Sequence, residues 1–263
     1  MTPAAKSSGP AGQSARWLSP LLERVRPAVP DRMNIDEILP RVLVCTVATE
    51  CGEGLIRLQR TCEKFEIDLK VFGRGKSWRG LGWRQRMLYW NLWRYLLKYD
   101  YVLFVDAYDT IVTCPLSEIM SKFLRMDTKL LFAAEVVSFP LAPEQYPPAV
   151  SPYPYKYLNA GGFIGEMRYV ARLMTQLRVY LFEDDYYDQL GYAEAFVSGR
   201  TAITLDYACE IFQCLFFAPD DIEIRGGRIT NRVTGSEPCI IHGNGEVDLT
   251  RVTHFVLDGE DRG

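Results

Sequence analysis

The strongest constraint on the fold is an apolar run, Tyr101–Val105, that leads into two carboxylates, Asp106 and Asp109. The run is long enough for one buried strand and too short for a helix. Because it is unbroken rather than alternating, it favours a parallel sheet that is covered on both faces. Ligands of such sheets bind at the carboxyl ends of the strands, so we expect the two acids to hold a divalent cation beside a phosphate. The alternative is that they only cap the next turn.

Strand-like and helix-like segments alternate on either side of this run. Strands are expected at 41–49, 69–72, 129–135, 203–206 and 238–241. Helices are expected at 55–65, 84–99, 115–124 and 169–181. This alternation is typical of βαβ units. It predicts the α/β class, with a mostly parallel central sheet flanked by helices in a Rossmann-like arrangement.

The composition is that of an ordinary globular protein. The chain has 263 residues, of which 48% are hydrophobic, and a net charge of -3 leaves no basic footprint for nucleic acid. No apolar run approaches the length of a membrane span, and the first residues lack a signal-peptide hydrophobic region. The 7 cysteines include no CxxC pair, which indicates free thiols in a reducing compartment. A cytoplasmic protein is therefore expected.

Residues 1–36 are predicted to be a disordered tail, because the first part is rich in Ala, Gly, Ser and Pro and cannot bury enough apolar surface. A docking segment for a partner is the alternative. Residues 37–263 are predicted to form a single domain, with no hydroxylase domain after them.

Two segments before the apolar run remain open to more than one interpretation. The glycines and basic residues of 73–82 suit an anion, but the spacing is not that of a Walker A loop, so a surface loop fits as well. The helix expected at 84–99 has Leu88 and Leu92 on one stripe, and Trp90 and Trp93 extend the apolar surface around it. A helix of this kind is expected to be covered on most sides, and a membrane or partner face is the alternative.

Later segments also carry candidate functional residues. The repeated Pro and Tyr of 138–157 predict an irregular functional loop. Gly161 and Gly162, inside an apolar segment, mark a close approach of backbone to a ligand or another strand. The acidic stretch 183–189 is by itself typical of a solvated surface. His242 ends the apolar run that begins at 238, at the edge where the ligand crevice is expected.

In this order, the motifs resemble the glycosyltransferase domain of the procollagen lysyl hydroxylases and their viral and bacterial relatives. The resemblance covers roughly 41–249 and rests on 78–80, 104–109, 133–135, 158–165, 188–190, 205–206, 211–213 and 241–245. It implies a GT-A fold that binds a UDP-sugar with Mn²⁺. The implied reaction moves a hexose, glucose or galactose, to a hydroxyl acceptor of the hydroxylysine or glycosylated-peptide type.

The resemblance also implies roles for individual residues. The metal ligands correspond to Asp106, Asp109 and His242, and the residues at the sugar and the reaction centre correspond to Asp188 and Asn159. Two carboxylates with a neutral imidazole suit Mn²⁺. A cation that bridges the diphosphate stabilises the UDP leaving group as a Lewis acid, and a further acid can orient the acceptor or stabilise oxocarbenium-like charge.

The positions assigned to donor binding come from five separate segments. Thr46 and Tyr108 correspond to the uridine contacts. The other positions assigned to donor binding are Trp78, Arg84 and Gly245.

Three positions depart from the family pattern. Asp248 stands where the family has a lysine that contacts the diphosphate, so another cation is needed. Tyr187 replaces an acid immediately before Asp188, and Phe139 replaces a tryptophan. The candidates for the compensating cation are Arg79, Arg84 and Arg251.

Two other functions fit parts of the pattern. A non-catalytic UDP-sugar binder would explain the departures at Asp248 and Tyr187. A haloacid-dehalogenase-like phosphatase would also start from a strand that ends in acids, followed here by Thr110. Such enzymes need the second acid two positions on, whereas Asp109 is three positions after Asp106.

Overall fold

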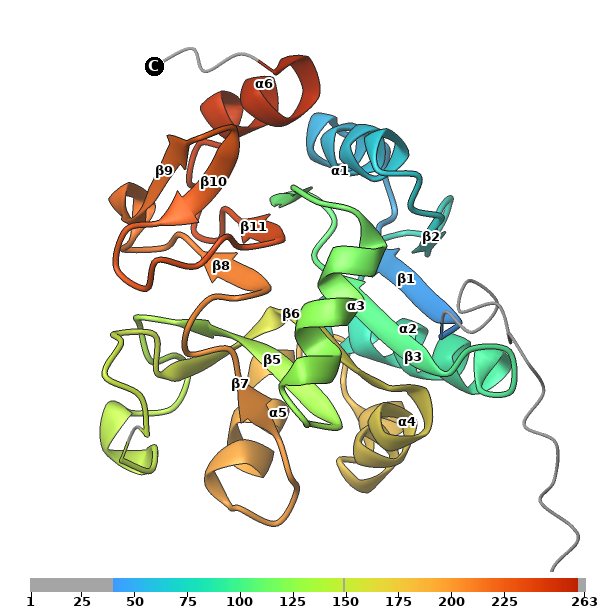
Figure 1. The fold of residues 1–263 in the computed structure, drawn as a ribbon. Helices are drawn as coiled ribbons and strands as arrows, with labels where there is room; N and C mark the ends of the chain where they lie inside the picture. Colours follow the sequence, from blue (N-terminus) through green and yellow to red (C-terminus); the bar gives the residue numbers. More distant parts are fainter. Residues whose placement is uncertain (1–39, 149, 260–263) are drawn as a thin grey trace, which may run out of the picture. The chain divides into compact units, whose positions relative to one another are not determined.

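A six-stranded sheet lies at the centre of the part of the chain that the computed structural model describes, residues 40–148 and 150–259 (Figure 1). Its strands in spatial order are β2 (Leu69–Phe72), β1 (Val42–Val47), β3 (Tyr101–Val105), β6 (Tyr157–Glu166), β5 (Leu130–Glu135) and β7 (Thr204–Leu205). Strand β6 is antiparallel to both of its neighbours, and the other pairs are parallel. The predicted α/β class with a mostly parallel sheet is confirmed. The predicted tail, 1–36, lies outside the described residues.

Helices cover both faces of this sheet. One face carries α2 (Leu81–Tyr95), α4 (Met167–Gln176) and α5 (Asp188–Val197), and the other carries α1 (Glu53–Lys64) and α3 (Leu116–Arg125). Successive residues of a strand point to opposite faces. In β3, Val102 and Phe104 join the first core, whereas Leu103 and Val105 join the second. Burial on both sides explains why this run is apolar without alternation.

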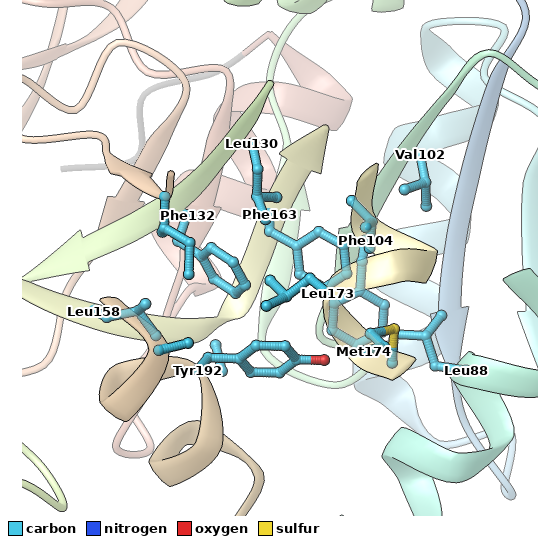
Figure 2. Packing of buried hydrophobic residues seen from close by; sticks show 14 of the residues in the cluster. Leu88, Val102, Phe104, Leu130, Phe132, Leu158, Phe163, Leu173, Met174 and Tyr192 are labelled. Atoms are coloured by element: carbon cyan, nitrogen blue, oxygen red, sulfur yellow. The ribbon is translucent and has the colours of Figure 1, made fainter. Parts of the chain in front are cut away.

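An aromatic group forms the centre of the first core (Figure 2). Phe163 of β6 has its ring centroid 5.2 Å from that of Phe104 and 5.1 Å from that of Phe132. The ring of Tyr192, in α5, lies 5.0 Å from Phe132. Aromatic contacts of this kind add about 1 kcal/mol each beyond the area that they bury. They hold α5 against the sheet and so fix the position of Asp188 in its first turn.

A second, smaller sheet packs beside α1 and α3. Its strands are β4 (Thr110–Val112), β11 (Ile240–His242) and β8 (Phe212–Cys214), in that order. The hairpin β9 (Ile222–Arg225)–β10 (Arg228–Asn231) and helix α6 (Thr250–Asp258) share an apolar cluster with it. In the antiparallel pair β4–β11, His242 stands opposite Thr110, the residue after Asp109. The small sheet therefore brings His242 close to Asp109, although the two residues are far apart in the sequence.

The described part of the segment 138–157 is irregular, as predicted, apart from the short 3-10 helix η2 (Pro143–Gln145) and Tyr157, which begins β6. Two further 3-10 helices are η3 (Val179–Leu181) and η4 (Pro219–Asp221). The helix predicted at 169–181 is wrong in its last part: α4 ends at Gln176, because Arg178 adopts the left-handed conformation with φ 55°. Among the described residues, every helix is too short or too polar to span a bilayer.

Helix α2 begins at Leu81, earlier than the predicted start at residue 84. Its first turn lies against the acidic stretch, where the Gly82 N–H donates to the Asp184 carbonyl at 3.0 Å. A Cβ at Gly82 would lie 1.8 Å from the Glu183 carbonyl oxygen, so the close approach requires glycine. The acidic stretch is thus packed on α2 rather than fully solvated.

Helix α2 is covered on most sides, as predicted, but its two outer tryptophans are not: within Leu81–Tyr95 the exposed residues are Trp90, Trp93 and Arg94. Leu88 and Leu92 are buried against the sheet, but Trp90 is 59% exposed and Trp93 is 43% exposed. The indole rings pack edge-on against Tyr89, on the face of the helix turned away from the sheet. Helical periodicity counts apolar residues but does not show whether a second layer of protein lies over them.

Candidate functional site: two cavities that meet at a cluster of acids

Asp106, Asp109 and His242 lie together at the carboxyl edge of the central sheet. Asp106 follows β3, Asp109 precedes β4 and His242 ends β11. One possible ligand atom from each lies within 4.8 Å of the others. His242 Nε2 is 3.2 Å from Asp109 Oδ2 and 3.8 Å from Asp106 Oδ2.

The donor set at this point fits a divalent cation. His242 Nε2 is buried and makes no hydrogen bond within the described residues, although it faces two carboxylates. A buried imidazole nitrogen that faces carboxylates and lacks a hydrogen-bond partner is typical of a metal ligand. Asp106, Asp109 and His242 would hold such an ion together.

Burial and charge shift the titration of these groups in opposite ways. Burial raises the pKa of Asp106, although the guanidinium of Arg84 opposes this shift. Burial alone would raise the pKa of Asp109, but the nearby His242 has the larger effect and the pKa is lowered. Burial alone would lower the pKa of His242, but the negative charge of Asp109 has the larger effect and the pKa is raised. Asp109 and His242 thus stabilise each other's charged form, whereas burial and the neighbouring Asp109 disfavour the charged form of Asp106.

Arg84 links the acid cluster to Asp188. Its guanidinium donates from Nη1 to Asp106 and from Nη2 to Asp188. The carboxylate of Asp188 also accepts from Gln85 Nε2 at 2.8 Å, and Gln85 accepts from Tyr192 at 2.8 Å. Asp188 is therefore buried and held in place, in contrast to the solvated surface that the acidic stretch suggests by itself.

Glu135, at the end of β5, organises the opposite wall. Its carboxylate accepts hydrogen bonds from Asn159 (3.1 Å), Gln189 (3.2 Å) and Asn244 (2.9 Å). Burial raises its pKa, and the amide donors oppose that shift. The sequence analysis recognised these positions as motif residues but did not assign Glu135 a role. Its position at a strand end is the signal that could have indicated one.

Two cavities meet at this point. The larger, of about 770 Å³, is lined by Trp78, Tyr108 and Arg57 among others. The smaller, of about 290 Å³, is lined by Asn159, Asp188 and Gly245 among others. The residues that line both cavities are Leu81, Arg84, Asp106 and Asp109. Of the predicted site residues, all but Thr46 line at least one of these two cavities.

Thr46 was expected to contact a uridine, but the structure places it away from the cavities. It is fully buried, and its hydroxyl has no hydrogen-bond partner among the described residues. By strand alternation it points to the same side as Val44, toward α1 and α3. Thr49, at the end of the same segment, lines the larger cavity instead.

The departure at Asp248 also has a structural explanation. Asp248 lines neither of the two cavities and accepts hydrogen bonds from Thr250 N (2.9 Å) and Oγ1 (2.6 Å) at the start of α6. Two arginines, Arg84 and Arg57, line the larger cavity. Arg57, which the sequence analysis missed, donates to the Tyr108 carbonyl at 2.8 Å.

Phe139 and Tyr187, the two other departures, form a pair at the smaller cavity. Their rings are perpendicular, with centroids 4.9 Å apart, and both side chains are partly exposed. Two aromatic side chains in contact thus replace the acid and the tryptophan of the family pattern.

Gly161 permits the close approach of β6 to the acid cluster. A Cβ at this position would lie 2.2 Å from His242 Cε1 and 2.8 Å from Nδ1. If these residues hold a divalent cation, we expect Gly161→Ala to displace the imidazole and to weaken the binding of Mn²⁺, used as the probe, by at least about tenfold in calorimetric titration. Gly52→Ala is the matched control, because a Cβ there meets no atom within 4 Å. Equal Mn²⁺ affinity in the two variants would show that His242 does not ligate the ion.

Comparison with known proteins agrees with this architecture. The family profile described as PLOD GT domain matches residues 39–255. The human multifunctional procollagen lysine hydroxylase and glycosyltransferase LH3 is 33% identical over 277 residues, which cover 96% of this chain and 37% of the human protein. Mouse procollagen-lysine,2-oxoglutarate 5-dioxygenase 2 is 32% identical over 84% of this chain and 31% of its own length.

The chain therefore spans about a third of the length of these relatives. Among solved structures, a glycosyltransferase involved in the glycosylation of the major capsid of PBCV-1 matches with a TM-score of 0.46 and 10% identity, over 79% of this chain and 95% of that one. The α/β fold and the family match define a glycosyltransferase domain. The chain belongs to the PLOD GT domain family.

Proposed function

We propose that this domain transfers a hexose, glucose or galactose, from a UDP-sugar to a hydroxyl acceptor in a Mn²⁺-dependent reaction. The observation that carries the proposal is the junction of two cavities at Asp106 and Asp109. A donor in the larger cavity and an acceptor in the smaller one would meet there. Mn²⁺ held by Asp106, Asp109 and His242 would act as a Lewis acid on the diphosphate.

The larger cavity has the groups that a nucleoside diphosphate needs. Tyr108 and Trp78 are 41% and 47% exposed and offer aromatic faces for a base. Arg84 and Arg57 bring guanidinium groups, which bind phosphate oxygens well. Asp248 does not line this cavity, which supports a donor site in which the arginines, rather than a residue at position 248, contact the diphosphate.

The smaller cavity has the groups that a sugar and its acceptor need. Asp188 is a buried carboxylate beside Arg84, placed to orient an acceptor hydroxyl or to balance positive charge on the sugar. Asn159 and Asn244 line the same space, and both amide groups are held in place by Glu135. A hydroxylysine-type or glycosylated-peptide acceptor is proposed from the relatives, one of which is named a procollagen lysine hydroxylase and glycosyltransferase.

The first test is UDP release by the purified chain from UDP-glucose and UDP-galactose, with Mn²⁺ and with excess chelator. We expect release with Mn²⁺, at a rate that candidate acceptors increase, and none with chelator. Mn²⁺-dependent UDP binding without release, whatever acceptor is offered, would favour the non-catalytic UDP-sugar binder. The phosphatase alternative is set aside because the chain belongs to a glycosyltransferase family. A cytoplasmic location remains a prediction.

Thr49 and Thr46 form a matched pair for the donor site. Thr49→Val removes a hydroxyl from the larger cavity, and we expect UDP affinity to fall by about tenfold, the value of one hydrogen bond. Thr46→Val removes a buried hydroxyl without a partner, so UDP affinity should stay the same and the free energy of unfolding should rise by about 1 kcal/mol. Titration with UDP and thermal unfolding measure both effects. Weaker UDP binding in Thr46→Val alone would restore Thr46 as the uridine contact.

A further inference from the structure

A second cluster of reactive groups lies outside the glycosyltransferase site, around Cys114 and Cys239. Cys114 follows β4 and Cys239 precedes β11, so the two cysteines stand at the same end of an antiparallel strand pair. The strands are joined there by Thr113 N, which donates to the Cys239 carbonyl at 2.9 Å. The two sulfurs and a carboxylate oxygen of Glu118 lie within 4.8 Å of one another. Both cysteines are buried and have no disulfide in this structure.

The charges around the two sulfurs disfavour a metal ion and favour thiol chemistry. Lys122 pairs with Glu118 at 3.2 Å, and Arg228 donates to the same carboxylate. A divalent cation in this cluster would therefore meet two fixed positive charges. Cys114 donates toward the Cys239 sulfur and Lys122 adds positive charge, so the pKa of Cys239 is below its usual value. A cysteine beside a cation is more easily ionised and more reactive.

We propose that Cys114 and Cys239 are a dithiol pair that closes to a disulfide by exchange with a low-molecular-weight disulfide. The Cys239 thiolate attacks one sulfur of the oxidant, which releases one thiolate and leaves a mixed disulfide. Cys114 then attacks the Cys239 sulfur, and the second thiolate leaves with the Cys114 proton. One oxidant disulfide and two cysteine thiols give one protein disulfide and two small thiols.

The disulfide would join the two strands that lead to the acid cluster. Asp109 precedes β4 and His242 ends β11, so the covalent link would close the strand pair at the end opposite to these residues. Cys114 and Cys239 are far apart in the sequence, and a link across a long loop restricts the unfolded chain strongly. Because both sulfurs are buried, the oxidant reaches them when the strand ends open locally or before folding is complete.

The test uses the full chain with Cys51→Ser, which removes the exposed cysteine. The denatured chain is refolded with a mixture of reduced and oxidised glutathione, and non-reduced peptides are mapped by mass spectrometry. We expect one linked pair, Cys114 with Cys239, and a Tm about 5 °C or more above that of the reduced chain. A linked pair between other cysteines, or no linked pair, would overturn the proposal.

Two further measurements keep the result unambiguous. Cys114→Ser and Cys239→Ser should each abolish the Tm difference between the oxidised and reduced forms, whereas Cys62→Ser, at another buried cysteine, should retain it. If one of these variants fails to fold, the peptide map of the chain that carries only Cys51→Ser decides whether Cys114 and Cys239 are linked. Retention of one Zn²⁺ per reduced chain, lost in Cys114→Ser, would instead identify a metal site and overturn the proposal.

Discussion

Asp106→Asn is expected to reduce the proposed hexose transfer by about 10³-fold, because it removes one of the two carboxylates at the junction of the cavities. The asparagine has nearly the same shape, but it brings no negative charge to balance a divalent cation. Mn²⁺ affinity should fall together with the transfer rate. Calorimetric titration with Mn²⁺ and the rate of UDP release measure the two effects separately.

The matched control for this variant is Asp100→Asn. Asp100 is an exposed aspartate whose partner is Arg41, at 2.9 Å, and it lines neither of the two cavities that meet at Asp106. Its substitution removes the same charge from the protein surface, and exposed ion pairs contribute little to stability. We expect its Mn²⁺ affinity and transfer rate to match those of the unmodified chain. Asp106→Asn with unchanged Mn²⁺ affinity would show that the acid cluster is not the metal site.

Asp188→Asn is expected to lower kcat for transfer by about 10²-fold or more while Mn²⁺-dependent UDP binding persists. Asp188 lines only the smaller of the two cavities and is held by Arg84 and Gln85. Its loss should therefore affect the sugar and acceptor step rather than donor binding. Steady-state kinetics of transfer and titration with UDP in the presence of Mn²⁺ separate the two.

Asp184→Asn is the control within the same acidic stretch. Asp184 pairs with Arg79 and Arg86 beside the first turn of α2 and lines neither cavity. Its kcat should stay close to that of the unmodified chain. If Asp188→Asn lowers UDP affinity as strongly as kcat, Asp188 contributes to the donor site and the division between the two cavities is wrong.

Arg84 connects the two variants. It donates to Asp106 and to Asp188, so each substitution removes the charged partner of one nitrogen of the same guanidinium. Desolvation of this buried arginine is offset by the surrounding carboxylates, which keep its pKa above the usual value. The effects of the two substitutions are therefore expected not to add in the double variant, because residues that share a partner are coupled.

The sequence by itself determined the central strand and the metal candidates. An apolar run as short as Tyr101–Val105 favours a buried strand over a helix, and acids at its carboxyl end fall at the ligand edge of an α/β sheet. For this reason Asp106 and Asp109 were placed correctly beside a crevice. The match of several motifs in order added His242, Asn159 and Asp188, which no local pattern would have brought together.

Only the tertiary structure decided which way side chains point and what covers them. Because β1 is buried on both faces, its residues show no polar alternation, and the sequence could not tell that Thr46 faces the helices while Thr49 reaches the cavity. The exposure of Trp90 depends on the absence of a neighbouring layer among the described residues, and the burial of Asp188 depends on Arg84 from another helix. Local periodicity specifies an element, whereas its surroundings come from segments far away in the chain.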